Sequence, residues 1–320
     1  MPDLRYLLRL GAFTLGIFIL FCALQPQAFL SVANLSSMAS QMPEFALLAL
    51  AIHGTMLTGG IDLSVVSIAN FGAILAAFCL KSGPGGLWLA VPTALLLGIA
   101  CGVCNGLLVA GLRLPAILAT LGTMQLYAGM AIGITSGVIH STAVTGIPLT
   151  YSNFVNGFVF GVPTPFLVLA ACFGLVYLIT ARAPLGKQMR LFGTNSRAAV
   201  FAGIPTFRVL ILTYAVSGFI AACAGLVMLA RANSASADYG TSYLLLSVLI
   251  NILAGVNPNG GSGTLFGVAL AVLSLQFISS GLNLLAVNSF ARDLLYGLLL
   301  VTVMAVNRLQ GRIHATRPRT

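Results

Sequence analysis

The chain has 320 residues, of which 59% are hydrophobic and only 6% charged, and its mean hydropathy is +1.04. A typical soluble domain is roughly 45–50% apolar and about 25% charged, so this composition excludes a soluble enzyme, a disordered chain and a nucleic-acid-binding domain. The net charge of +10 does not indicate DNA binding, because the basic residues stand at the ends of long apolar runs, as they do in membrane proteins. The sequence therefore predicts a polytopic integral membrane protein.

Ten apolar runs are candidates for membrane-spanning helices, each of which needs about 20 residues. They cover residues 7–30, 42–58, 66–80, 86–110, 115–139, 163–181, 208–230, 244–258, 264–282 and 291–307. The second, third and eighth runs are short, which indicates helices that are broken or that reach only partway into the bilayer. The 35 glycines predict helices that pack closely. We therefore expect an all-α fold with about ten transmembrane helices in a single transmembrane domain over residues 1–320.

The distribution of basic residues predicts the orientation of the chain. Basic residues without any acid occur in residues 182–208 and in the C-terminal tail, and Arg5 and Arg9 lie near the N-terminus. Because cytoplasmic loops carry an excess of Lys and Arg, we expect both termini and the 182–207 loop to be cytoplasmic. The loops on the other side, 141–164 and 232–243, contain one charged residue, Asp238, and only Lys81 departs from this pattern.

The two halves of the chain resemble each other at an offset of about 175 residues. Gly85-Gly86 and Gly260-Gly261 each precede a long apolar run, and Asp62 and Asp238 each precede a shorter one. In the expected topology, spans two to five and seven to ten run in opposite directions. This is an inverted repeat, the architecture in which transporters place a pathway between two halves. Chance similarity between glycine-rich membrane segments is the alternative.

Polar residues within or beside the spans are candidates for a translocation pathway. Asp62 lies in a glycine-rich break followed by a helix, where it would either cap that helix and bond neighbouring helices or contact a polar solute. Amide side chains would either join helices or bind a neutral, hydroxyl-rich solute. The pathway candidates are Gly59, Gly60, Asp62, Ser64, Asn70, Gln125, Asn251 and Asn283. His53 and His140 lack ligand-spaced partners, so no metal is expected, and Cys101-x-x-Cys104 is interpreted as a pair of small packing residues.

The basic loop 182–207 contains a short helix-forming piece, Ser196–Ala202, which Asn195 or Ser196 would cap. Glycines on either side of this helix are interpreted as hinges, and the helix is interpreted as a docking element for a partner. The docking candidates are Gly186, Gly193, Arg197, Ala198, Ala199 and Gly203. The chain contains neither the Gly-x-x-x-x-Gly-Lys-Ser/Thr phosphate loop nor serine-hydrolase or zinc-protease motifs. We expect no catalytic residues and no cofactor, so any ATP would be hydrolysed by another chain.

Three motifs in order resemble the ribose-type sugar permeases of ATP-binding-cassette (ABC) importers: Gly59 to Ser64, Leu185 to Ile204, and Gly260 to Thr264 ahead of Ser280-Gly281-Leu282. The resemblance implies a permease subunit in the bacterial inner membrane that works as a dimer of permeases. It also implies two ATP-binding subunits, which dock on the 186–203 loop, and a periplasmic sugar-binding protein.

Several positions depart from the usual pattern of the family. Val66 stands where a glycine is usual, Leu244 and Leu246 replace an acidic pair, and Ala254-Gly255 replaces a second glycine pair. This loss of symmetric features suits one half of a heterodimer and is most similar to the D-type permeases of autoinducer-2 importers. A homodimeric pentose or hexose permease stays open. The rival from another class is a secondary transporter driven by an ion gradient, for which Asp62 is the best candidate relay.

Overall fold

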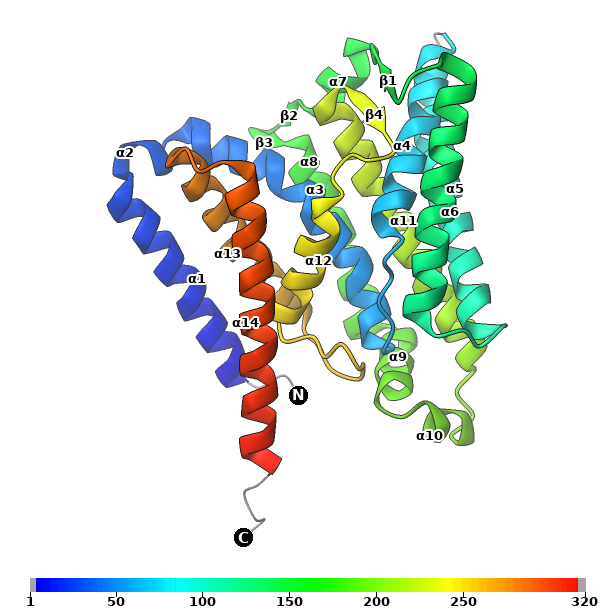
Figure 1. The fold of residues 1–320 in the computed structure, drawn as a ribbon, viewed down its shortest axis with the longest axis vertical. Helices are drawn as coiled ribbons and strands as arrows, with labels where there is room; N and C mark the ends of the chain where they lie inside the picture. The colour runs from blue at the N-terminus through cyan, green and yellow to red at the C-terminus, as the bar shows by residue number, and fades with distance from the viewer. Residues whose placement is uncertain (1–3, 84, 316–320) are drawn as a thin grey trace.

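The computed structural model describes residues 4–83 and 85–315, which form a bundle of long helices (Figure 1). The helices of the first half are α1 (Leu4–Leu24), α2 (Pro26–Phe29), α3 (Val32–Leu57), α4 (Val65–Lys81), α5 (Gly86–Ala110), α6 (Ala116–Ile139) and α7 (Leu149–Val155). The second half contains α8 (Thr164–Tyr177), the π-helical turn η1 (Leu178–Arg182), α9 (Pro184–Thr194), α10 (Ser196–Phe201), α11 (Thr206–Ala232), α12 (Ser242–Leu253), α13 (Leu265–Leu284) and α14 (Ser289–Ala315). The short strands are β1 (Ala143–Thr145), β2 (Phe158–Val159), β3 (Val162–Pro163) and β4 (Ser234–Ser236).

A helix occupies each of the ten apolar runs, and the fold is all-α apart from the four short strands. Within the described residues, seven helices are long and apolar enough to cross a membrane: α1, α3, α5, α6, α8 with η1, α11 and α13. The third and eighth runs form the short apolar helices α4 and α12, as their length predicted. The chain is therefore a multi-pass helical membrane protein.

Three of the expected boundaries were wrong. The first run does not form one helix to residue 30, because α1 ends at Leu24 and the short α2 begins at Pro26. Proline has no N–H to continue the helical bonds and disfavours a helical conformation in the residue before it. The second run is not short, since its helix begins at Val32, where the Ser31 hydroxyl caps it. The eighth run forms α12, which ends at Leu253 and not at residue 258, ahead of Gly255 with its φ of +76°.

The core of the bundle is built around α11, which packs against α3, α4 and α5. Glycines make the closest approaches: a Cβ added at Gly98 would collide with the backbone of Gly218, and one added at Gly225 would collide with the backbone of Ala69. Small residues let helix backbones approach in this way in a bilayer, where packing holds helices together. The predicted close packing at glycines is confirmed.

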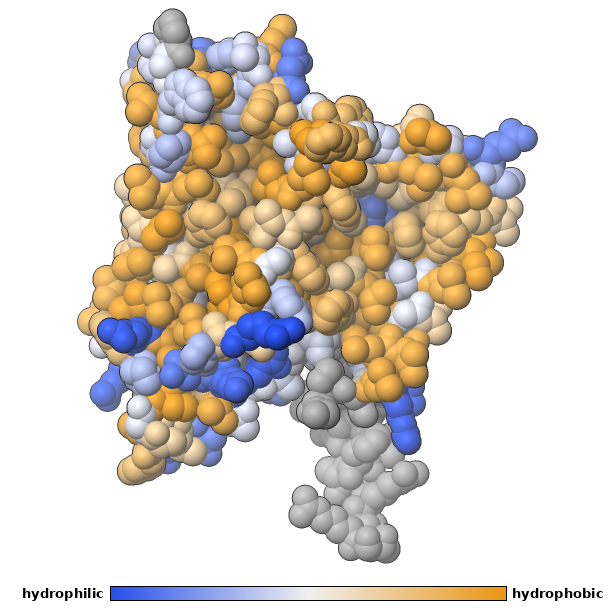
Figure 2. Space-filling view, turned by 180° about the vertical axis from the view of Figure 1, so that it is seen from behind, coloured by the Kyte–Doolittle hydropathy of each residue, from blue (hydrophilic) through white to orange (hydrophobic). Residues whose placement is uncertain are grey.

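The two ends of the molecule differ in character. The Leu4 end of α1, the Ala315 end of α14, and α9 and α10 lie at one end (Figure 1). At the opposite end β1 pairs with β4, so the two charge-poor loops lie together. Figure 2 shows an apolar surface over the middle of the molecule and hydrophilic residues gathered toward the end that carries α9 and α10.

Candidate functional site

The break between α3 and α4 holds Asp62 in a closed hydrogen-bond network. Asp62 is fully buried, and its Oδ1 accepts from the backbone N–H and the hydroxyl of Ser64, at 3.1 and 2.6 Å. Its Oδ2 accepts from the Ser217 hydroxyl at 2.9 Å, and Asn105 Nδ2 donates to Ser64 Oγ at 2.7 Å. Asp62 thus ties the entry to α4 to α11 and, through Ser64, to α5. Asp62 was expected either to cap α4 and bond neighbouring helices or to contact a polar solute. This geometry supports the bonding of neighbouring helices.

The two glycines of the break lie against neighbouring segments. Gly59 has a φ of +81°, which favours glycine, and a Cβ there would be 3.0 Å from the carbonyl oxygen of Asn259. A Cβ at Gly60 would be 2.7 Å from the Tyr214 hydroxyl and 2.9 Å from Ala116 Cβ. These glycines let the extended chain pass between α6, α11 and the loop that follows α12.

Two of the candidate amides bind backbone carbonyls inside the bundle. Asn70 of α4 is buried and donates from Nδ2 to the carbonyl oxygens of Ala237 and Tyr239, at 2.7 and 2.9 Å. Asn251 of α12 is also buried; its Nδ2 donates to Ala49 O at 2.8 Å, and its Oδ1 lies 3.3 Å from Nδ1 of the His53 ring. Each short helix is thereby joined to the other half of the chain.

The remaining pathway candidates are not gathered with the break. Gln125 lies on an exposed face of α6, and Asn283 is exposed near the end of α13. The predicted pathway residues therefore do not form one site: four lie in the break, two join helices and two lie on the surface.

The basic loop forms the helices α9 and α10. Asn195 is the cap that the sequence predicted, since its Oδ1 accepts from the Ala198 N–H at 3.0 Å. Ala199 is buried, whereas Arg197 and Ala198 are exposed, and Phe201 at the end of α10 is 93% exposed. This end of the molecule thus presents a basic helix with an uncovered aromatic side chain.

Two of the three glycines expected to be hinges are instead tightly packed helix positions. Gly186 lies in α9, where a Cβ would collide with the backbone of Ile179 and Thr180. Gly193 lies near the end of the same helix and is equally enclosed. Only Gly203 is a turn residue, with a φ of +73° and open space around it. The spacing of glycines cannot distinguish a hinge from a close contact.

Gly193 stands at a junction of three segments, which we call the glycine junction: Leu57, Gly59, Gly193, Gly260 and Gly261. A Cβ at Gly193 would collide with the Leu57 carbonyl oxygen and lie 2.5 Å from Gly261 N. Gly261 N itself donates to Leu57 O at 3.0 Å. A Cβ at Gly260 would be 2.7 Å from Gly59 N. The end of α3, the end of α9 and the loop between α12 and α13 therefore meet backbone to backbone.

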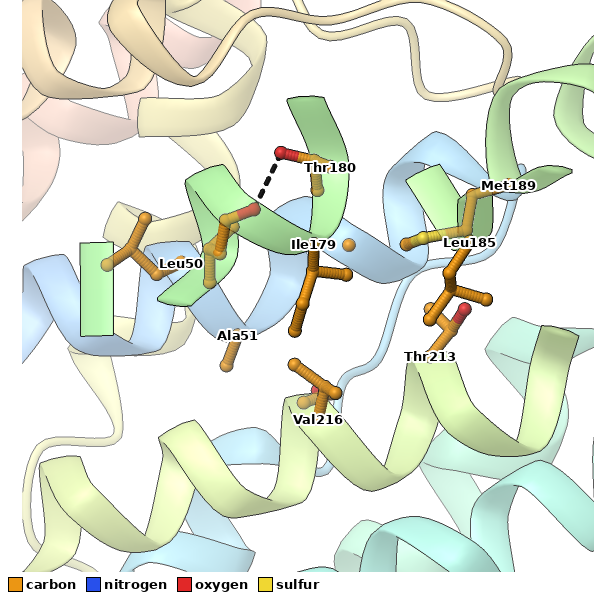
Figure 3. A pocket seen from close by; sticks show the side chains of 11 residues that line it. Leu50, Ala51, Ile179, Thr180, Leu185, Met189, Thr213 and Val216 are labelled. Carbon is orange, nitrogen blue, oxygen red and sulfur yellow. Dashed lines mark hydrogen bonds between the residues drawn. The ribbon is translucent and has the colours of Figure 1, made fainter. Parts of the chain in front are cut away.

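Side-chain contacts reinforce this attachment of α9. Arg190 Nη1 donates to Gly263 O at 2.9 Å. Partial burial lowers the pKa of Arg190, but a guanidinium remains charged in proteins. Figure 3 shows the contact on the other face of α9, where Leu185 and Met189 lie beside Ile179 and the α11 side chains. The void among them is about 10 Å³, scarcely room for one water molecule, so it is a packing contact and no solute site.

A larger, polar cavity of about 420 Å³ lies between α3, α12, α13 and α14. It is lined by Gln41, Glu44, Phe45, Arg231, Tyr239, Gly240, Thr241, Ser242, Tyr243, Leu246, Gln276, Ser279, Ser289, Arg292, Asp293 and Tyr296. Neither Glu44 nor Arg231 is among the site residues predicted from the sequence. The available signal was the charge of each residue within a long apolar helix, since such residues usually face a partner or a polar cavity.

The fold and these features define a class: a polytopic membrane protein with a polar cavity in one half and a basic, helical surface at the opposite end. Comparison with known proteins narrows the class. Residues 34–304 match the family model described as the branched-chain amino acid transport system permease component, so the chain belongs to this permease family.

Curated relatives come from importers. The autoinducer 2 import system permease protein LsrD of Yersinia enterocolitica is 32% identical over 261 residues, or 81% of this chain and 78% of that protein. The ribose import permease protein RbsC of Bacillus subtilis is 31% identical over 304 residues, or 94% and 92% of the two chains. The predicted resemblance to ribose-type ABC permeases is confirmed.

A solved structure shares the fold. The chain of a metal-chelate type ABC transporter, in an inward-facing conformation, superposes with a TM-score of 0.56 at 16% identity. The match covers 96% of this chain and 100% of that one. At this identity the likeness concerns the arrangement of helices alone.

Proposed function

We propose that this chain is the permease subunit of a bacterial ABC importer that moves a monosaccharide or a sugar-like solute across the inner membrane. It would act as one transmembrane domain over residues 1–320 with ten spans and cytoplasmic termini. Separate ATP-binding subunits, a second permease and a periplasmic sugar-binding protein would complete the importer. The relatives named for ribose import and autoinducer 2 import support this class of cargo.

The observation that carries the proposal is the attachment of α9 at the glycine junction. A partner that moves α9–α10 would move the end of α3 and the loop ahead of α13 with it, because Gly193 contacts both through backbone atoms. Backbone segments that pack directly on one another, with no flexible side chains between them, transmit a displacement from one segment to the next. ATP-driven closure of the partner subunits would thus reach the pathway, with Gly186, Gly193, Arg197, Ala198, Ala199 and Gly203 as the docking candidates.

The order of elements supports an inverted repeat, which alternating access exploits by moving one repeat against the other. A long helix, a break, a short apolar helix and two further helices occur as α3 to α6 and again as α11 to α14. α3 and α11 run in opposite directions, since Gly54 and Thr213 line one pocket while Glu44 contacts Arg231. The break that holds Gly59 to Ser64 lies at the contacts between these halves. The amide side chains of Asn70 and Asn251 lie at these contacts too.

The docking claim is tested by replacing Arg197 and Ala198 together with Glu. The double variant should insert into the membrane normally but lose the ATP-binding subunit and with it uptake. Uptake at the parent rate would refute docking on α10. The matched control is Thr142→Glu, at an exposed position of the loop at the opposite end of the molecule, which should retain the ATPase.

A second experiment separates the importer from an ion-coupled carrier. We expect uptake of radiolabelled D-ribose or autoinducer-2 to stop when ATP is depleted and to survive collapse of the proton and sodium gradients. The opposite result would favour the carrier. The bonded state of Asp62, which accepts from Ser64 and Ser217, favours the importer, since a relay carboxylate must be reached by the ion.

A further inference from the structure

The polar cavity between α3, α12, α13 and α14 has the size and position of a solute site. Its volume of about 420 Å³ falls within the roughly 300–1,000 Å³ of small-molecule pockets. Glu44, Gln276 and Tyr296 are buried and form its inner part, whereas Thr241 and Ser289 are exposed at its rim. The cavity lies in the half of the molecule away from α9 and α10.

The charges that line the cavity balance. Glu44 Oε1 lies 3.2 Å from Arg231 Nε, and Glu44 Oε2 accepts from the Tyr243 hydroxyl at 2.7 Å. Arg292 and Asp293 add one charge of each sign, and Asp293 Oδ2 accepts from the Ser242 hydroxyl at 3.1 Å. The cavity lining therefore carries no net charge, which favours a solute without net charge over an ion.

The cavity also has hydrogen-bonding capacity that the protein leaves unused. Gln276 is 2% exposed, and its Oε1 has no hydrogen-bond partner among the described residues. A buried acceptor left unpaired costs about 1–3 kcal/mol, so such an atom beside a cavity points to a ligand that donates to it. Arg231 donates to Ser40 O at 2.7 Å and faces Glu44, which leaves part of its five-donor guanidinium free.

Aromatic rings supply the rest of the lining. The Tyr243 ring packs edge to face against Phe45 and against Tyr239, with ring centroids 6.4 and 6.5 Å apart respectively. Such rings offer apolar surface to the carbon–hydrogen face of a small molecule while the polar groups fix its hydroxyls. Donors, acceptors and rings together match a compound in which every hydroxyl both donates and accepts.

We infer that this cavity binds the transported solute during its passage, and that the solute is a small, uncharged polyhydroxyl compound held by Gln276 and the Glu44–Arg231 pair. The inference rests on the proposed function and names a site for it. An amino acid, with its two opposite charges, would compete with the Glu44–Arg231 pair, and its binding would contradict the inference.

Ser279→Cys tests occupancy directly, since Ser279 lines the cavity. The variant is labelled with a thiol reagent in membranes that contain the assembled complex, and the unsubstituted chain with its own six cysteines sets the background. D-ribose, and in a second sample autoinducer-2, should slow labelling of Ser279→Cys but not of Thr142→Cys in the exposed loop that follows α6. Protection by L-leucine instead, or protection by neither sugar-like probe, would overturn the inference.

Gln276→Leu supplies a second, independent measurement. We expect uptake of the transported solute to fall about tenfold, the effect of one lost polar contact. Gln27→Leu, at an exposed position of α2, is the matched control and should transport normally. Normal uptake by Gln276→Leu would refute the site and leave the proposed function intact, whereas absence of ATP-driven uptake in the parent complex would refute the function itself.

Discussion

Replacing Gly193 with alanine tests the glycine junction. The added Cβ would collide with the Leu57 carbonyl oxygen, lie 2.5 Å from Gly261 N and lie 3.1 Å from Gly260 Cα. All three are backbone atoms, so no side chain can rotate away. The Gly261 N–H to Leu57 O hydrogen bond of 3.0 Å lies in the path of the new methyl group and must lengthen.

The size of the effect follows from opposing contributions. Alanine in place of glycine favours a helix by about 1 kcal/mol, which offsets about 1 kcal/mol for the weakened hydrogen bond. Overpacking of a close contact then remains, at about 1–3 kcal/mol. We expect the solubilised variant to lose its folded, monodisperse form at a temperature several degrees below that of the parent, and to couple ATP hydrolysis to uptake poorly.

Gly174→Ala is the control, because Gly174 also lies in a helix but has open space around it. The assay is size-exclusion chromatography of the detergent-solubilised chain after heating, together with uptake in cells. Gly174→Ala should retain or slightly raise the parent's thermal stability. If the Gly193→Ala and Gly174→Ala variants lose their folded form at the same temperature, the backbone segments do not meet at Gly193.

Three further predictions use single substitutions. Arg197→Glu should weaken co-purification of the ATP-binding subunit without lowering the amount of chain in the membrane, as quantitative blotting would show; undiminished co-purification would contradict it. Asp62→Asn should destabilise the chain by about 1–3 kcal/mol, because an amide N–H₂ cannot accept the bonds that the carboxylate accepts, whereas Asp238→Asn, at an exposed position, should not; equal melting temperatures would argue against the network. Asn251→Ala should cost a similar amount, because it removes the bond to the Ala49 carbonyl and leaves Nδ1 of the buried His53 ring without a partner; exposed Asn283→Ala is its control, and a melting temperature equal to that of the control would count against this contact.

The local features of the fold were predictable from the sequence. Each of the ten apolar runs coincides with a helix, and seven helices of the described residues are long and apolar enough to cross a membrane, because in a bilayer each spanning segment must satisfy its own backbone hydrogen bonds. The short lengths of α4 and α12 and the Asn195 cap also follow from neighbouring residues alone. Pro26 was available as a signal for the end of α1, yet the apolar run around it concealed that signal.

The sites depended on contacts between distant segments. Glu44 and Arg231 form an ion pair across α3 and α11, and no local pattern indicates which charges meet. Gly193 looked like a hinge because glycine serves both flexible turns and close backbone contacts, and only the position of Leu57 decides between them. Asn70 and Asn251 were expected either to join helices or to bind a solute, and their backbone partners depend on the packing of the two halves.

The most direct test of the proposed importer is affinity purification of this chain from native membranes in mild detergent, with identification of the chains that accompany it. We expect a subunit with an ATP-binding phosphate loop in stoichiometric amount, together with a second permease, either a different chain or a further copy of this one. Loss of the ATP-binding subunit from the Arg197→Glu variant would show that its contact with this chain is specific. A preparation that transports solute but contains no ATP-binding subunit would contradict the account and favour an ion-coupled carrier.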